Sequence, residues 1–312
     1  MPKNKLKELK VKKLLLLIAA LIMFLTMVVG CASNKPAGPL TDDLGQTINI
    51  KGTPQRIVSL APSNTEILFA LGLGSKVVGT DSDSDYPAAA TTLPHLGSGY
   101  PSFDVESIVN LKPDLVIGFG YTMPDYVTQL ENMGIPVVIL APKDVNGVIS
   151  DITLVGKITG ATTQAKTLTT GMQNSLNTIE TKIKGVTNPR VLWEFDGTDP
   201  SNPWVAGPGS FNDSMITLAG GQDVGASGPT SSWQMSTENI VKADPQIIIL
   251  DDYQYGVTVQ SVEQRPGWST ITAVKNGAIY PITDSDLTDR PGPRVIDGLQ
   301  ILAQDIHPEL FK

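Results

Sequence analysis

The sequence of 312 residues has little of the chemistry that metal sites and nucleophilic enzymes use: it contains one cysteine and two histidines. A single cysteine, Cys31, cannot form an internal disulfide, so a large core must stabilise the fold. Two histidines cannot build a His-rich metal site, and His95 and His307 each adjoin a proline, which is more typical of loop residues than of ligands. We therefore expect no metal and no cofactor.

Motifs of common enzyme classes are missing as well. The sequence contains no G-x-S-x-G, no Walker loop and no H-E-x-x-H. Leu71-Gly72-Leu73-Gly74 resembles part of a dinucleotide loop, but it follows a predicted helix, so we interpret it as a helix stop. The pair Asp251-Asp252 follows a predicted strand, and we expect it to be solvated at the surface. These observations predict a protein that is not an enzyme.

The N-terminus predicts export. Six lysines within the first 13 residues precede an uncharged apolar run of 16 residues at positions 14–29, shorter than the roughly 20 residues of a membrane span. Val28-Val29-Gly30-Cys31 then predicts a signal peptide over residues 1–30, cleaved so that Cys31 carries lipid. An uncleaved anchor helix is the alternative, and both place the bulk of the chain outside the cytoplasm on a membrane surface. Residues 31–40 are small, polar and Pro-rich, which predicts a flexible tether.

Positive charge is scarce beyond this leader. The whole chain has a net charge of −8, and cleavage would remove six lysines, so the mature protein is more acidic still. This acidity argues against nucleic acid as a partner, because phosphates need basic patches. Only five arginines occur, and Arg56 and Arg190 adjoin predicted strands. The remaining three are too few for a strongly anionic ligand, which favours a near-neutral one.

Short apolar runs alternate with helical patterns over residues 41–144, which predicts an N-terminal lobe with a parallel sheet covered on both faces. Ser63 and Glu66 have the spacing of a capping box, so we expect a helix from Ser63 to Leu71. Residues 145–185 keep a helical period and end in one long helix, from about Thr162 to Lys184. The α/β pattern then resumes over residues 186–312. The predicted fold is α/β, with two Rossmann-like lobes that have parallel central sheets and are joined by a single long helix.

An internal repeat supports two similar lobes. Phe103–Ile117 and Met235–Ile249 both contain E-x-I-V-x-x-x-P before an apolar strand, at a constant offset of 132 positions. Glu106 and Glu238 therefore both lie in the first turn of a predicted helix, where the helix dipole stabilises a carboxylate. Either glutamate alone needs no further explanation. Two at matching places could also dock on the arginines of a two-subunit permease, and chance similarity of the two segments is the alternative.

Four segments carry a resemblance to a known family. Arg56–Gly74, Asp83–Pro87, Phe103–Ile117 and Gly292–Arg294 resemble the helical-backbone (class III) periplasmic binding proteins, which serve ABC importers of cobalamin, haem and ferric siderophores. Within that group the chain is most similar to the cobalamin-binding members. The resemblance implies a monomer with little hinge motion, whose partners are a permease dimer with its ATPase. It also implies that Glu106 and Glu238 dock on permease arginines.

The resemblance further implies a flat ligand, such as cobalamin or a related corrinoid, in the cleft between the lobes. Aromatic rings suit such a ligand because they give a large contact area at low entropic cost. The implied aromatic wall is Tyr100, Phe119, Trp204 and Trp233, and the implied polar contacts are Asp286 and Arg290. The family has a tyrosine where Asp83 aligns, and Tyr86 is expected to substitute for it. Core packing is the alternative for each ring, and we assign Trp193 to the core.

The alternatives within this fold are a ferric siderophore or haem as the ligand. A different class, an extracytoplasmic enzyme on a two-lobed scaffold, is disfavoured by the shortage of histidine and cysteine. A purely structural surface lipoprotein remains a further alternative, and it would lack an open cleft lined by aromatic rings.

Overall fold

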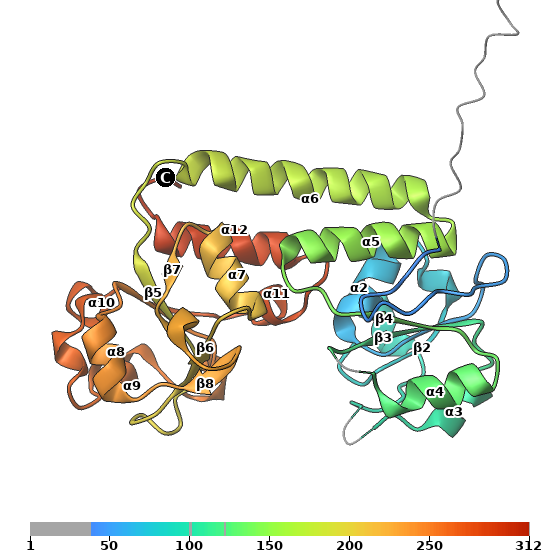
Figure 1. Cartoon of the computed structure of the whole chain (residues 1–312), viewed down its shortest axis with the longest axis horizontal. Helices are drawn as coiled ribbons and strands as arrows, with labels where there is room; N and C mark the ends of the chain where they lie inside the picture. The colour runs from blue at the N-terminus through green and yellow to red at the C-terminus, as the bar shows by residue number, and fades with distance from the viewer. Residues whose placement is uncertain (1–38, 100–101, 122, 312) are drawn as a thin grey trace, which may run out of the picture. The chain divides into compact units, whose positions relative to one another are not determined.

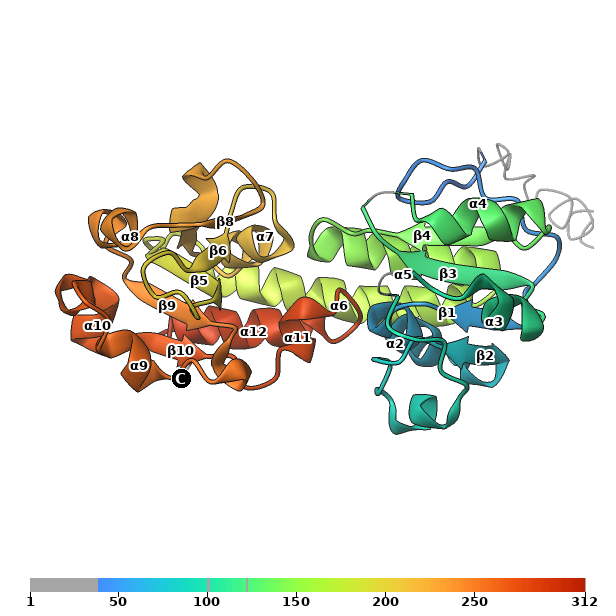
Figure 2. The ribbon, with the colours of Figure 1, turned by 90° about the horizontal axis from the view of Figure 1, so that it is seen from below.

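The computed structural model describes residues 39–99, 102–121 and 123–311. The predicted signal peptide, Cys31 and Tyr100 lie outside these ranges. The described residues form two lobes, each with one sheet, as Figures 1 and 2 show. The predicted α/β class with two lobes is confirmed. Within the same ranges, no helix combines the length and the apolar character needed to cross a bilayer.

The N-terminal lobe contains a four-stranded sheet in the order β2-β1-β3-β4, and all of its strand pairs are parallel. The strands are almost entirely buried, which is why each is a continuous apolar run. Three helices and two 3-10 turns complete the lobe. The elements are β1 (Ile57–Ser59), α2 (Pro62–Ala70), η1 (Gly74–Lys76), β2 (Val77–Thr80), η2 (Ala88–Thr92), α3 (Val105–Asn110), β3 (Leu115–Phe119), α4 (Asp125–Asn132) and β4 (Val137–Leu140).

The capping box predicted for the first helix is wrong. Helix α2 begins one residue earlier, at Pro62, and its N-cap Ala61 makes no side-chain hydrogen bond. Proline is well tolerated there because the first N–H of a helix has no partner within the helix. Ser63 and Glu66 are both buried, at 3% and 2% exposure. Glu66 instead contacts an arginine far along the chain, described below with the site.

Two helices follow the N-terminal lobe, and the second is the single long helix that the sequence predicts between the lobes. Helix α5 (Val145–Thr159) ends at Gly160, which has a left-handed φ of 78°, and α6 (Thr162–Ile183) then runs for 22 residues. The two helices approach closely, since a Cβ at Gly156 would collide with the Cβ of Ala165. Helix α6 packs on α5 and on α12 (Val295–Ile306), so it spans from one lobe to the other (Figure 1).

The C-terminal lobe has a mixed sheet, which corrects the expectation of parallel strands alone. Its order is β10-β9-β5-β6-β8, and β7 pairs with β5. Strands β10, β9, β5 and β7 are parallel, whereas β6 is antiparallel to both β5 and β8. Strands β6 and β8 are three residues each, too short for a periodic signal. The strands are β5 (Arg190–Asp196), β6 (Trp204–Ala206), β7 (Gln222–Asp223), β8 (Ser232–Gln234), β9 (Ile247–Leu250) and β10 (Ile279–Pro281).

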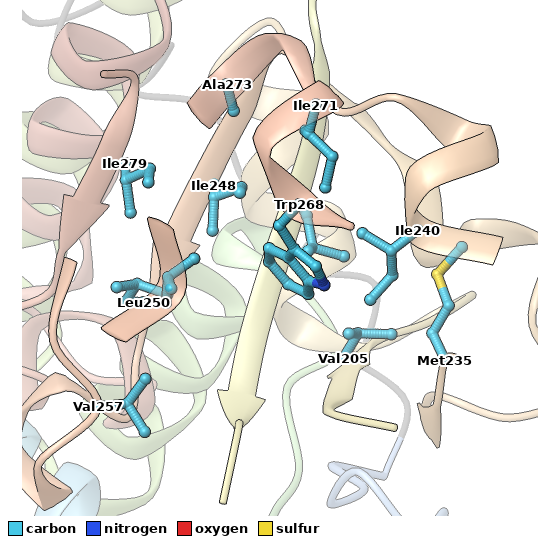
Figure 3. Close-up of a cluster of buried hydrophobic side chains, with 12 residues drawn as sticks. Val205, Met235, Ile240, Ile248, Leu250, Val257, Trp268, Ile271, Ala273 and Ile279 are labelled. Carbon is cyan, nitrogen blue, oxygen red and sulfur yellow. The ribbon is translucent and has the colours of Figure 1, made fainter. Parts of the chain in front are cut away.

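Short helices surround this sheet. They are α7 (Phe211–Leu218), η3 (Val224–Ser227), α8 (Thr237–Ala243), η4 (Tyr253–Tyr255), α9 (Val259–Glu263), η5 (Trp268–Thr270), α10 (Thr272–Asn276) and α11 (Asp286–Asp289), followed by α12. Trp268 is fully buried at the centre of one hydrophobic cluster, between strand residues such as Ile248 and the helix residue Ile240 (Figure 3). Its Nε1 donates to Thr237 Oγ1 at 3.2 Å, so the ring also fixes the start of α8.

The acidic pair after β9 is buried, and the prediction that it is solvated is wrong. Asp251 and Asp252 are 6% and 2% exposed. Asp251 accepts a hydrogen bond of 3.0 Å from Trp193 Nε1, and Asp252 accepts one of 2.6 Å from the Gly197 N–H. These contacts tie the end of β9 to β5, and the assignment of Trp193 to the core is confirmed by its complete burial.

We predict that Trp268→Ala lowers the free energy of unfolding by about 3–5 kcal/mol, because it leaves a large cavity in a packed core. Urea denaturation measures this loss. Tyr255→Ala is the control, since Tyr255 is 78% exposed, and it should change stability by less than about 0.5 kcal/mol. Equal effects of the two substitutions would contradict the central place of Trp268.

Candidate functional site

A cleft of about 590 Å³ is lined by residues of both lobes. Two aromatic rings come from each side: Phe119 and Tyr121 from the N-terminal lobe, and Phe195 and Phe211 from the C-terminal lobe. The cleft also has polar groups, among them the ammonium group of Lys143 and several serine hydroxyls. A hollow of this size with aromatic walls and a few polar groups is typical of a small-molecule site.

The sheets explain why these rings meet. Phe119 is the last residue of β3, and Phe195 is the penultimate residue of β5. Carboxyl ends of parallel strands are where open α/β sheets bind ligands. Phe211 opens α7, directly after the N-cap Ser210, whose Oγ accepts from the Asp213 N–H. Three of the four rings, Phe119, Phe195 and Phe211, are therefore carried by strand ends or a helix start, and Tyr121 lies two residues beyond the end of β3.

The two N-terminal aromatic residues contact each other. The ring centroids of Phe119 and Tyr121 are 5.7 Å apart at an interplanar angle of 75°, an edge-to-face arrangement that aromatic pairs prefer. The hydroxyl of Tyr121 donates to the carbonyl oxygen of Pro142 at 3.3 Å. Phe119 also lines a second hollow of about 510 Å³ in the N-terminal lobe, together with Asp83. The two hollows thus meet at Phe119.

The structure separates the predicted tryptophans from this wall. Neither Trp204 nor Trp233 is among the described residues that line the two hollows. Trp204 is 41% exposed on β6. Trp233, on β8, is partly buried against the C-terminal core, and its Nε1 donates to the Gly225 carbonyl at 3.0 Å. Pairing of β6 with β8 places these residues on the added antiparallel strands, whereas Phe195 lies on β5.

The predicted polar residues Asp286 and Arg290 lie in an ion-pair network that joins the lobes. Arg290 contacts Asp286 at 2.9 Å and Asp85 at 2.5 Å. Arg294 binds Glu66 through two hydrogen bonds, of 3.0 Å from Nε and 2.6 Å from Nη2. Glu66 and Asp85 belong to the N-terminal lobe, and the arginines belong to the C-terminal lobe. This inter-lobe network, Glu66, Asp85, Asp286, Arg290 and Arg294, therefore crosses between the two.

Two features of its surroundings shift the pKa of Glu66 in opposite directions. Burial raises the pKa of Glu66, while the guanidinium of Arg294 acts in the other direction. The hydrogen bonds that Arg294 donates to Glu66 in turn raise the pKa of Arg294. Tyr86, another predicted ligand contact, is also joined to this network, because the Arg294 guanidinium lies 4.1 Å from the centre of its ring.

A second acidic pair lies at the edge of the cleft. Asp289 lines the cleft, and its side chain meets that of the buried Asp251. Desolvation raises the pKa of both carboxyls, and the charge of Asp251 raises the pKa of Asp289 further. The pair consequently presents less negative charge to the cleft than two ordinary aspartates would. Among the residues described, no group of three His, Cys, Asp or Glu side chains is arranged to hold a metal.

Glu106 and Glu238 occupy matching places outside the cleft. Each lies in the first turn of its helix, α3 or α8, as predicted, and both are exposed. Side-chain caps begin both helices: Asp104 accepts from the Glu106 N–H at 3.0 Å, and Ser236 accepts from the Asn239 N–H at 3.3 Å. In Figure 1 each helix lies on the side of its own lobe away from α6.

Sequence reasoning did not find Tyr121, Phe195, Phe211 or Lys143. Two signals were present: Phe195 ends an apolar run as Phe119 does, and Phe211 follows a serine that begins a helix. Glu66 was misassigned because its partner, Arg294, is 228 positions away.

We predict that Glu66→Gln lowers the free energy of unfolding by about 3–5 kcal/mol, because the partly buried Arg294 loses its nearest charge partner and keeps only Asp286, at 3.6 Å. Asp85→Asn is the matched control at the exposed side of the same network, where Asp85 is 61% exposed, and it should cost less than about 1 kcal/mol. Urea denaturation compares the two variants. A loss for Glu66→Gln no larger than that of the control would show that the buried pair is dispensable.

Comparison with known proteins agrees with this architecture. The sequence profile described as periplasmic binding protein matches residues 57–285. An uncharacterized ABC transporter substrate-binding lipoprotein of Bacillus subtilis (strain 168), YvrC, is 34% identical, over 94% of this chain and 97% of the relative. A vitamin B12-binding protein of Yersinia pestis (strain Pestoides F) is 27% identical, over 81% of this chain and 86% of its own.

Solved structures show the same fold. The periplasmic heme-binding protein RhuT of Roseiflexus sp. RS-1, in its apo form, has a TM-score of 0.72 at 28% identity, covering 83% of this chain and all of that one. The profile match, the Bacillus relative and this fold lead to one conclusion. The chain belongs to the periplasmic binding protein family, among the substrate-binding proteins of ABC transporters.

Proposed function

We propose that this protein captures a large, flat ring compound outside the cytoplasm, cobalamin or a related corrinoid, and delivers it to an ABC importer. The single observation that carries the proposal is the cleft of about 590 Å³ with two aromatic rings on each side. Aromatic rings from both lobes suit a planar guest, because stacking gives much contact area at little cost in conformational entropy. The relatives that bind vitamin B12 support this choice of ligand.

Haem is the second candidate, and one feature of the cleft favours it. Lys143 lines the same cleft as the four rings, and an ammonium group attracts carboxylates such as the propionates of haem. The similar structure from Roseiflexus is a heme-binding protein. Asp289, which also lines the cleft, opposes such a ligand less than an ordinary aspartate would, since its pKa is raised.

We further propose that Cys31 carries the lipid that anchors the protein to the membrane. The small residues before Cys31 and the lipoprotein relative support this proposal. Mass spectrometry of the protein extracted from membranes should show a chain that begins at residue 31 with acyl groups attached. A mature N-terminus at any other residue would contradict it.

Titration with cyanocobalamin and, in parallel, with haemin tests the ligand. We expect 1:1 binding of cyanocobalamin, weakened about tenfold or more in Phe195→Ala and Phe211→Ala, because each removes one stacking ring. Phe311→Ala is the control, since Phe311 contacts Lys182 near the C-terminus and does not line the cleft. Binding of haemin alone would favour the second candidate, and binding of neither at micromolar concentration would contradict a flat ring ligand.

Docking on the permease is tested by removing the two matched carboxylates. The double variant Glu106→Gln, Glu238→Gln should lose most transport while its ligand affinity stays within about twofold, because exposed charges govern docking more than ligand binding. Glu180→Gln on α6 is the control, as an exposed glutamate away from α3 and α8. Transport in cells and titration of the purified protein give the two readings. A collapse of ligand affinity would show that the two glutamates do not serve docking.

A further inference from the structure

The repeated unit of the two lobes includes an arginine. Helices α3 and α8 begin at Val105 and Thr237, and the following strands begin at Leu115 and Ile247, at the same offset of 132 positions. Both helices are followed by a residue other than glycine in the left-handed region, Lys112 with a φ of 50° and Asp244 with a φ of 46°. The two helix ends therefore have the same backbone course.

One arginine binds each of these helix ends. The Nε of Arg56 donates to the carbonyl oxygens of Leu111 and Lys112 at 3.2 and 3.1 Å, and its Nη2 donates to Leu111 at 2.6 Å. The Nε of Arg190 donates to the carbonyl oxygens of Ala243 and Asp244, both at 2.9 Å. The last carbonyls of a helix have no partner within it, and a cation there also meets the negative end of the dipole.

The two arginines hold these helices to the sheets. Arg56 directly precedes β1, and Arg190 is the first residue of β5. A second link repeats as well: Asp114 accepts from the backbone N–H of Arg56 at 2.9 Å, and Gln246 accepts from that of Arg190 at 3.1 Å. Each helix is thus fixed at its C-terminal end to the strand beside it, in addition to the burial of Ile108 or Ile240.

The cleft does not share this repetition. The N-terminal sheet is wholly parallel and the C-terminal sheet is mixed, and the polar groups on the two sides of the cleft differ. What the lobes have in common is an exposed glutamate, the short helix that carries it and the arginine that fixes that helix. A structural feature that occurs in both lobes is explained by a function that both lobes share. Docking on two equal surfaces of a permease dimer is such a function.

We propose that Arg56 and Arg190 are positioning residues that set the direction of Glu106 and Glu238 for the permease. This inference rests on the proposed docking function. It differs from electrostatic steering in the sign of its effect. Loss of an arginine makes the acidic protein more negative, so steering toward permease arginines alone would strengthen docking. If the arginines instead hold α3 and α8 in position, their loss should weaken docking.

The test measures binding of the cyanocobalamin-loaded protein to its reconstituted permease–ATPase complex in nanodiscs. The double variant Arg56→Gln, Arg190→Gln should bind about tenfold more weakly, a loss comparable to one or two well-formed hydrogen bonds. Arg56→Lys with Arg190→Lys should lie in between, because a lysine keeps the charge and loses the planar fork. Lys166→Gln, which removes an exposed cation on α6, is the control and should bind as tightly as the unaltered protein.

Amide hydrogen exchange gives a second reading, and we expect faster exchange in α3 and α8 of the double glutamine variant with ligand affinity within about twofold. Unchanged or tighter docking would overturn the inference. So would a parallel fall in melting temperature, ligand affinity and docking, since that pattern indicates general stabilisation. If Glu106→Gln with Glu238→Gln impairs docking and the arginine variants do not, only this inference fails. If neither pair of substitutions affects docking, the proposed docking role of Glu106 and Glu238 is contradicted, and this inference, which rests on it, is contradicted as well.

Discussion

The ion pair between Glu66 and Arg294 is the contact on which the rest of the structure depends. It joins two residues that are 228 positions apart in the sequence and that lie in different lobes. Its carboxylate is almost fully buried, so the loss of either partner would leave a buried charge with only a more distant opposite charge, Asp286 for Arg294 or Arg290 for Glu66. Because the walls of the cleft come from both lobes, this pair and helix α6 together set the spacing of those walls.

The two lobes are alike in one part of their structure and differ in another. Their helix-to-strand units α3–β3 and α8–β9 are alike, down to the arginine that caps each helix, whereas the residues of the cleft differ from one lobe to the other. Repetition therefore follows the surface that a symmetric partner would contact. A ligand without such symmetry can be bound by two unlike walls, and the residues that line the cleft do differ between the lobes.

Much of the fold was predictable from the sequence, because buried parallel strands and a 22-residue helix leave strong periodic signals. Strands β6 and β8 could not be predicted, since three residues are too few to show a periodic pattern. The placement of Trp204 and Trp233, which lie on these strands, was missed for the same reason. Of the expected site residues, Phe119 and Asp83 line the hollows, Asp286 and Arg290 belong to the inter-lobe network, and Tyr86 contacts Arg294 of that network. Pairings between distant side chains depend on the folded arrangement, which local patterns do not encode.

If the buried ion pair fixes the lobes around the cleft, the distance between the lobes should depend on the charge of Glu66. Spin labels on Gln129→Cys in α4 and Gln260→Cys in α9, with Cys31 replaced by serine, would report the distance between the lobes by electron double resonance. We expect one narrow distance distribution, the same with and without cyanocobalamin, which becomes broad when Glu66→Gln is added. A broad distribution in the labelled protein itself, or no change on loss of the Glu66 charge, would contradict it.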